Sequence, residues 1–147
     1  MASAIAGIAL AAIGMPIVFE RWTQSRVEIV QTIYSLTPEK SVLVSNYKET
    51  QKVMNELYGE RLVVDLEETD QSVLRRLFAT GASEYVVLLL RTDGTYWQKR
   101  SADLQNRFET VAGAYDFRLI LDRKATATDR LQIWKMKRRL NADRTRL

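Results

Sequence analysis

The sequence predicts an α/β protein, in which an N-terminal transmembrane helix precedes a three-layer domain with a mainly parallel sheet and a C-terminal antiparallel hairpin. Three observations predict this class. The first nineteen residues carry no charged side chain. Short apolar runs then alternate with segments of helical periodicity, which is typical of strands and helices that form a parallel sheet. The last two apolar runs, 117–122 and 130–136, are joined by a polar turn, as in a hairpin.

Composition and charge divide the chain into three parts: an apolar segment over 1–20, an α/β domain over 21–136 and a basic tail over 137–147. The 147 residues are 46% hydrophobic and 27% charged, which is ordinary for a globular domain. The chain contains no cysteine and no histidine, so disulfides, thiol nucleophiles, Cys/His zinc sites and histidine general bases are excluded. The net charge is +4, but the stretch over 135–147 contributes +5, so the basic character belongs to the tail.

The apolar segment predicts a transmembrane helix over 1–20. As a helix, residues 2–19 would extend for about 27 Å at ~1.5 Å per residue, close to the ~30 Å of a hydrocarbon core, and Trp22 follows as an interfacial anchor. A cleaved signal peptide is an alternative, although no basic region precedes the run, and so is a buried helix, although its usual polar stripe is missing. Small residues recur along one face and would let other transmembrane helices approach closely: Ser3, Gly7, Ala11 and Gly14.

The first elements of the domain follow from local signals. Helical periodicity over 27–36 ends before Pro38, because the residue preceding a proline is pushed out of the α region. The continuous apolar run 41–46 predicts a strand that is buried on both faces. Asn46 then caps a second helix, with Glu49 completing a capping box.

The alternation continues through the rest of the domain. A second buried strand over 61–66 precedes a helix capped by Thr69 or Asp70. The run 84–91 is the most hydrophobic, so we place its strand at the centre of the sheet, and Ser101 is expected to cap the next helix. The apolar residues expected to face the sheet from these two helices are Val73, Leu74, Leu77 and Phe78, and Leu104, Phe108, Val111 and Ala112.

Ligands of open parallel sheets gather beyond the carboxyl ends of the strands, so ligand-binding residues are expected there. A dinucleotide fold or a P-loop needs a glycine-rich turn after the first strand, where Ser45 and Asn46 stand. A phospho-acceptor receiver domain needs acidic residues at that position and an aspartate after the third strand, where Arg91 stands. The residues predicted to bind a ligand at this edge are Asn46, Glu68, Asp70 and Arg91, with Trp97 as a stacking surface.

Two clusters near these strand ends each allow two interpretations. The acidic residues within 65–70 have the chemistry of a magnesium or calcium site. They also complement a helix dipole; we favour this second interpretation and predict neither a metal nor a cofactor. Tyr96 and Trp97, beside Lys99 and Arg100, form either a stacking and phosphate-binding surface or an aromatic pair that docks a loop onto the sheet.

The basic tail matches anionic partners by charge. Cations near an anionic membrane contribute about 1 kcal/mol each, nucleic acid is attracted by the same charges, and a solvated chain end accounts for the composition equally well. We predict membrane lipids as partners and no nucleic acid. The residues expected to contact lipid headgroups are Arg138, Arg139 and Arg144.

The order of these features resembles a known family. An apolar span leads into an amphipathic helix and then into TPEKSVLVSNYKETQKVMNELYGERLVVDL (37–66), and the final hairpin ends in LQIWKM (131–136). The arrangement resembles, over 4–136, the C-terminal extramembrane domain of polytopic glycosyltransferases of the protein O-mannosyltransferase and aminoarabinose-transferase type. This resemblance implies a lipid-phosphate sugar as donor and an extracytoplasmic location for the α/β domain, whereas Arg21 and Arg26 after the span favour the cytoplasm by the positive-inside rule.

The catalytic acids of that family lie in early extracytoplasmic loops, and the spans that frame those loops have no counterpart in this sequence. No catalytic residue is therefore carried over. We expect a non-catalytic, membrane-anchored accessory domain of a membrane glycosyltransferase, either in a fragment that begins at an added Met-Ala-Ser or in a free-standing partner subunit. The alternative is a single-span membrane interaction protein whose α/β domain recruits a partner. A soluble phosphate-binding enzyme is disfavoured by the missing glycine loop.

Overall fold

Five strands form one mixed sheet in the computed structural model, which describes residues 25–47 and 61–137. The strand order is β2-β1-β3-β5-β4; β1 pairs in parallel with β2 and β3, whereas β5 is antiparallel to β3 and β4. The sheet is therefore less parallel than predicted, because the C-terminal hairpin supplies both antiparallel pairings, with β4 at the edge. The strands are β1 Val42–Ser45, β2 Leu62–Asp65, β3 Ser83–Arg91, β4 Phe117–Lys124 and β5 Asp129–Met136.

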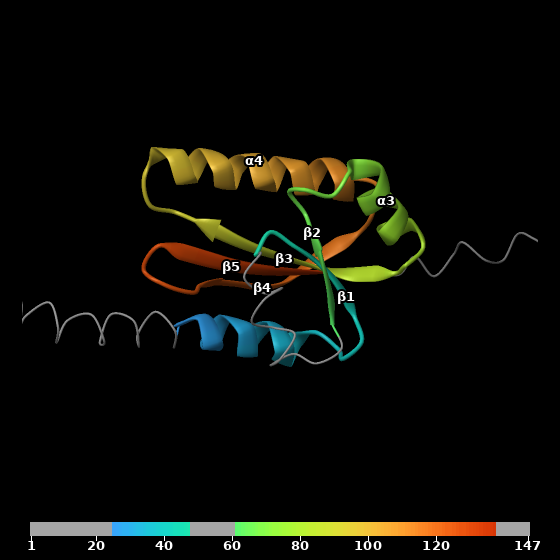
Figure 1. Ribbon diagram of the computed structural model, residues 1–147, viewed down its shortest axis with the longest axis horizontal. Coiled ribbons are helices and arrows are strands. Elements are labelled where there is room, and N and C mark those ends of the chain that lie inside the picture. Colours follow the sequence, from blue (N-terminus) through green and yellow to red (C-terminus); the bar gives the residue numbers. More distant parts are fainter. Residues whose placement is uncertain (1–24, 48–60, 138–147) are drawn as a thin grey trace, which may run out of the picture.

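Helices cover both faces of this sheet, which confirms the three-layer prediction (Figure 1). α3 (Gln71–Ala79) and α4 (Thr95–Ala112) lie on one face, and a helix over 25–36 lies on the other. None of the helices in the described ranges has the length and apolar character needed to cross a bilayer. The predicted transmembrane helix over 1–20 and the predicted helix after Asn46 lie outside those ranges.

The central strand β3 contributes to both cores, because its side chains alternate between the two faces. Val86, Leu88 and Leu90 pack beneath α3 and α4, whereas Tyr85 and Val87 pack against the helix over 25–36. All five are buried. The prediction that the most hydrophobic strand is central is confirmed.

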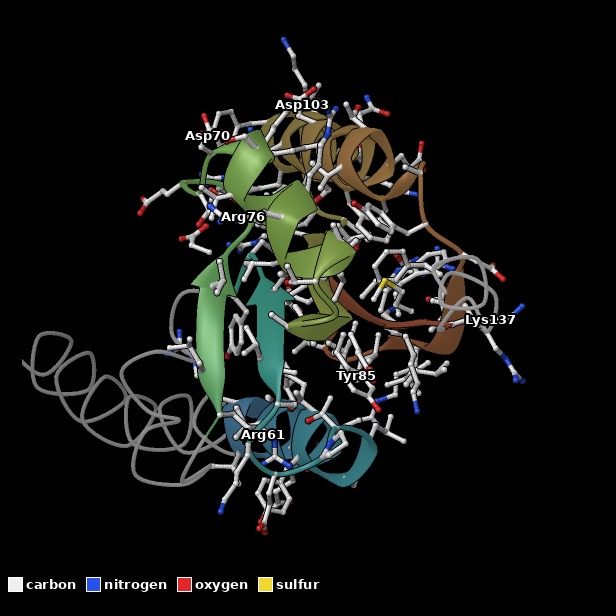
Figure 2. All side chains as sticks on the ribbon, turned by 90° about the vertical axis from the view of Figure 1, so that its right-hand side faces the viewer. Arg61, Asp70, Arg76, Tyr85, Asp103 and Lys137 are labelled. Atoms are coloured by element: carbon white, nitrogen blue, oxygen red, sulfur yellow. The ribbon has the colours of Figure 1, made fainter. Side chains whose placement is uncertain are left out.

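α3 begins at the predicted cap but buries a narrower face than predicted. Asp70, labelled in Figure 2, is the N-cap residue, and its carboxylate accepts a hydrogen bond from the Ser72 amide at 2.7 Å. Leu74 and Phe78 are buried, but Val73 is 47% exposed, so its predicted inward orientation is wrong. One residue corresponds to about 100° of rotation in a helix, so Val73 lies off the stripe that Leu74 and Phe78 form, whereas Leu77 is half-buried beside it.

α4 begins seven residues earlier than predicted, because its N-cap residue is Gly94 and not Ser101. Gly94 is the N-cap residue and makes no side-chain capping bond, so the start carries no sequence signal of the Ser/Thr/Asp/Asn type. The Ser101 hydroxyl instead accepts from the Arg91 amide and donates to the Arg91 carbonyl, both at 2.9 Å. The early start places Trp97 on the same helical face as Leu104, two turns further along.

Candidate functional site

A cavity of about 580 Å³ lies at the carboxyl ends of the parallel strands. Its walls come from the ends of β1 and β3, the segment after β2, the first turns of α4, the β4–β5 loop and the beginning of the helix over 25–36. This is the edge at which open α/β sheets bind ligands. We call it the strand-end pocket; its polar and aromatic lining includes Asn46, Glu67, Arg91, Trp97, Arg100 and Asp129.

Two arginines lie over one indole ring in this pocket. The guanidinium carbon of Arg91 is 4.8 Å from the Trp97 ring centroid, and that of Arg100 is 5.7 Å away, within the range of cation–π attraction. Asp93 accepts from Arg91 at 2.7 Å, and Glu67 accepts from Arg100 at 2.6 Å. These hydrogen bonds raise the pKa of both arginines, so both remain cationic. Because a guanidinium has five N–H donors, one carboxylate partner leaves donors for a ligand.

The two ion pairs differ in exposure. The Arg91 and Asp93 side chains are 45% and 42% exposed, so water screens their attraction and an incoming anion replaces Asp93 at small cost. In the second pair, Arg100 is 42% exposed and Glu67 is 20% exposed. The two arginines are therefore similarly exposed, and only the carboxylate of the second pair is more buried.

Asn46 lines the pocket, but its side-chain amide is already hydrogen-bonded to the sheet. Its Nδ2 donates to the Leu89 carbonyl at 2.9 Å, and its Oδ1 accepts from the Leu89 amide at 2.8 Å. Since β1 ends at Ser45, the Asn46 side chain continues the β1–β3 ladder where the backbone pairing stops. Asn46 therefore holds the rim of the pocket in place rather than presenting free polar atoms to it.

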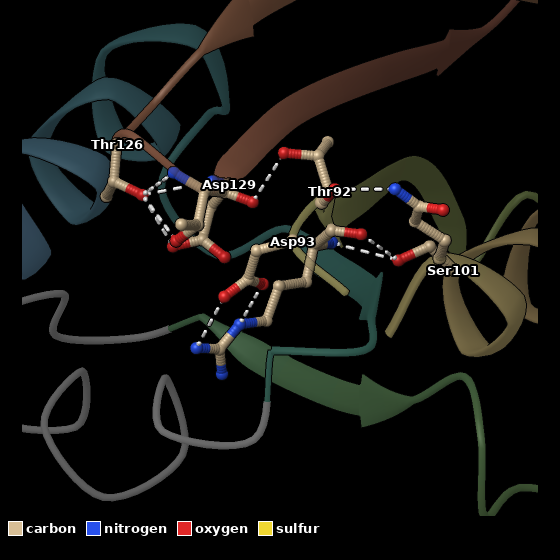
Figure 3. A network of polar contacts seen from close by, with 8 residues as sticks. Thr92, Asp93, Ser101, Thr126 and Asp129 are labelled. Carbon is tan, nitrogen blue, oxygen red and sulfur yellow. Dashed lines mark hydrogen bonds and ion pairs between the residues drawn. The ribbon is translucent and has the colours of Figure 1, made fainter. Parts of the chain in front are cut away.

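The rim on the other side is a network of threonine contacts that joins two loops (Figure 3). The Thr92 hydroxyl and amide both donate to the Thr128 carbonyl, at 2.9 and 2.7 Å, and Gln98 donates to the Thr92 carbonyl at 3.0 Å. Within the β4–β5 loop, the Thr126 hydroxyl donates to the Asp129 carboxylate at 2.7 Å. The loop after β3 is thereby tied to the hairpin before any ligand arrives.

The predicted ligand residues Glu68 and Asp70 do not line the pocket. Asp70 caps α3, and the hydrogen bond from Ser72 lowers the pKa of its carboxyl group. Asp65 accepts from the Glu67 and Glu68 amides at 2.7 and 3.1 Å and so closes the turn after β2. Across the part of the chain that the structure describes, no three acidic side chains gather in a way that could hold a metal ion.

The structure brings the predicted residues Asn46, Arg91 and Trp97 into one pocket lining, together with Glu67 and Arg100, which were not among the predicted ligand residues. The contact between Glu67 and Arg100 joins positions 33 residues apart, so no local sequence pattern predicts it. A partial signal for Arg100 exists, since it lies three residues after Trp97 and shares its helical face. That spacing becomes informative only when the start of α4 is known.

The chemistry of the lining suits the binding of an anion. The charged residues of the described lining are three arginines (Arg26, Arg91 and Arg100) and two carboxylates (Glu67 and Asp129), and Asp93 adds a third carboxylate beside Arg91. The indole of Trp97 adds an apolar surface beside the guanidinium groups. No protein-family model matches this chain, and no curated protein matches it. Its function is therefore inferred from the pocket and from the resemblance described above.

Proposed function

We propose that this chain is a non-catalytic, membrane-anchored accessory domain of a membrane glycosyltransferase that uses a lipid-linked sugar donor, and that the strand-end pocket binds the donor headgroup. The observation that carries the proposal is the pair Arg91 and Arg100 on the Trp97 ring. A phosphodiester bears one negative charge, and guanidinium groups bind phosphate through paired N–H donors. The apolar C–H face of a sugar ring stacks on the indole.

The position of the pocket along the chain supports a ligand that comes from the membrane. Ser25 and Arg26 line the pocket, and the predicted span ends at residue 20. Five residues extend for at most about 18 Å, and each headgroup layer of a bilayer is roughly 5–8 Å thick. A headgroup held in the same bilayer as the predicted span is therefore within reach. In agreement with the resemblance, we place this domain on the extracytoplasmic side.

The test is calorimetric titration of the full chain in zwitterionic nanodiscs with a short-chain prenyl phosphate that carries one sugar. Each charge-assisted hydrogen bond contributes about 1.5–3 kcal/mol, so we expect Arg91→Gln and Arg100→Gln each to weaken binding about 10- to 100-fold. Lys124→Gln, which removes an exposed cation of β4 outside the pocket, is the matched control and is expected to bind like the parent. Trp97→Ala is expected to weaken binding of the phosphosugar more than that of the prenyl phosphate alone.

Asp93→Asn separates ligand binding from simple charge attraction to the surface. Because Asp93 competes with the ligand for Arg91, its removal is expected to increase affinity several-fold. Absence of binding by the parent chain, or equal losses in Lys124→Gln and Arg91→Gln, would overturn the assignment of the pocket.

A further inference from the structure

We propose that the opposite end of the domain carries a second anion site, formed by Arg118 on β4 and Lys135 on β5, that binds a multiply charged phosphate group. Figure 2 views the domain from this end, where Tyr85 and Lys137 are labelled. From Asp129 at the strand-end pocket, β5 runs six residues to Lys135, roughly 20 Å at ~3.4 Å per residue. The second site is therefore separate from the first and does not rest on the function proposed for it.

The first observation is the strand register, which places two cations directly opposite each other. Arg118 of β4 is the cross-strand partner of Lys135 of β5. Side chains in such positions have Cβ atoms about 4.5–5.5 Å apart, and like charges there are destabilising. Both side chains are exposed. The fold therefore maintains an unfavourable pair of like charges, which an anion bound between the two side chains would relieve.

The second observation is that carboxylates do not neutralise this pair. Within the described part of the chain, Arg118 has no hydrogen bond and no ion pair, and Lys135 has no carboxylate partner. The Lys135 ammonium lies 5.4 Å from the ring centroid of Tyr85, its partner on β3. The other end of the same hairpin differs: there, Lys124 faces Arg130, but Asp122 accepts two hydrogen bonds from Arg130 at 2.5 and 2.6 Å.

The third observation is a hollow of about 600 Å³ around the pair. Lys137 adds a third cation to its lining, and its ion pair with Asp116, at 3.3 Å, is more than half exposed on both sides and so exchanges readily. Glu84 contributes a carboxylate, which leaves a formal charge of +2 among the described lining residues. A phosphomonoester or pyrophosphate group has the complementary charge and enough oxygens to bridge two cations.

The experiment compares affinity and stability in the full chain in detergent micelles at constant, low ionic strength. Pyrophosphate is titrated calorimetrically, with sodium chloride as the control for general screening. We expect Arg118→Gln and Lys135→Gln each to weaken pyrophosphate binding about tenfold. Lys124→Gln is the matched control, because it removes an exposed cation from the same hairpin outside the hollow, and it is expected to keep the parent affinity.

The unfolding temperature, measured without and with pyrophosphate, distinguishes an anion site from a merely structural role of these residues. Because like charges at directly opposed strand positions repel, we expect both variants to unfold at the parent temperature or slightly above it. Added pyrophosphate is expected to raise the unfolding temperature of the parent and of Lys124→Gln more than that of Arg118→Gln at the same concentration. A parent chain that binds no pyrophosphate, or an equal response of all variants, would refute the site.

Vesicles of anionic phospholipid distinguish the two sources of the phosphate. Vesicle binding that pyrophosphate displaces, and that Arg118→Gln weakens, supports the site and assigns it to lipid headgroups. Pyrophosphate binding without vesicle binding supports the site and assigns it to a soluble phosphate compound. Vesicle binding that is unaffected in both variants and by pyrophosphate counts against the site, since it would come from other cations of the chain.

Discussion

Replacement of Asn46 by alanine is expected to lower the free energy of unfolding by about 2 kcal/mol. The substitution removes the bonds of 2.9 and 2.8 Å between the Asn46 amide and the Leu89 backbone. A typical intramolecular hydrogen bond contributes about 0.5–1.5 kcal/mol net, and a buried partner left without a bond adds to the cost. Because these bonds are only partly buried, water can bond to the Leu89 backbone groups in the variant. The expected loss of unfolding free energy therefore stays near the sum of two ordinary hydrogen bonds.

The measurements are urea unfolding followed by circular dichroism and amide hydrogen exchange at Leu89. Asn46→Ala is expected to accelerate exchange of the Leu89 amide, because that amide donates to Asn46 Oδ1. Asn46→Asp keeps the acceptor but loses the donor, so the Leu89 amide is expected to stay protected while stability still falls. Asn106→Ala is the matched control: Asn106 is exposed on α4, and alanine there is expected to stabilise by no more than about 0.7 kcal/mol.

Two results would refute this account of Asn46. Leu89 exchange at the parent rate in Asn46→Ala would show that the side chain does not complete the β1–β3 ladder. Unfolding free energies within about 0.5 kcal/mol of the parent would show that the two bonds carry no net stability. Either outcome would return Asn46 to the role predicted from the sequence, that of a residue free to bind a ligand.

Three further substitutions test the fold around the sites. Phe78→Ala is expected to cost about 3–5 kcal/mol in urea unfolding, because Phe78 is 2% exposed and has T-shaped ring contacts. Gly94→Ala is expected to cost about 1–3 kcal/mol by the same measurement, since φ 70° and ψ 148° form a region essentially reserved for glycine. The hydrogen bond from Arg130 lowers the pKa of Asp122 below its ordinary 3.8, so its contribution to stability is present above pH 3.8 and lost as the pH falls through the lowered value. Asp122→Asn should therefore show a shallower loss of unfolding free energy in acid titration than the parent.

The strands and one helix cap were predictable because their signals are local. The continuous apolar runs fix the positions of β1, β2 and β3, and the greater hydrophobicity of β3 fixes its central place, since a central strand is covered on both faces. Asp70 was one of two predicted caps, and a carboxylate at that position satisfies an orphan amide of α3.

The remaining features depend on contacts that no window of sequence contains. The start of α4 at Thr95 follows a glycine cap without a capping side chain, so Ser101, which is of a preferred cap type, misled the prediction. Glu68 and Asp70 stand at a strand end as binding residues do, yet neither lines the pocket: Glu68 lies in the turn closed by Asp65, and Asp70 caps α3. The hairpin position, with β5 beside β3, makes the sheet mixed and is set by long-range pairing.

A rim whose own hydrogen bonds are complete costs little to order when a ligand binds. The amide of Asn46 and the hydroxyls of Thr92 and Ser101 already have partners within the fold, whereas the guanidinium groups of Arg91 and Arg100 keep donors in excess of their carboxylate partners. Loss of a rim bond should therefore lower stability and loosen the pocket, while loss of Arg91, whose ion pair is exposed, should lower affinity with little effect on stability. That separation is what allows the structural and the binding roles of neighbouring residues to be told apart by experiment.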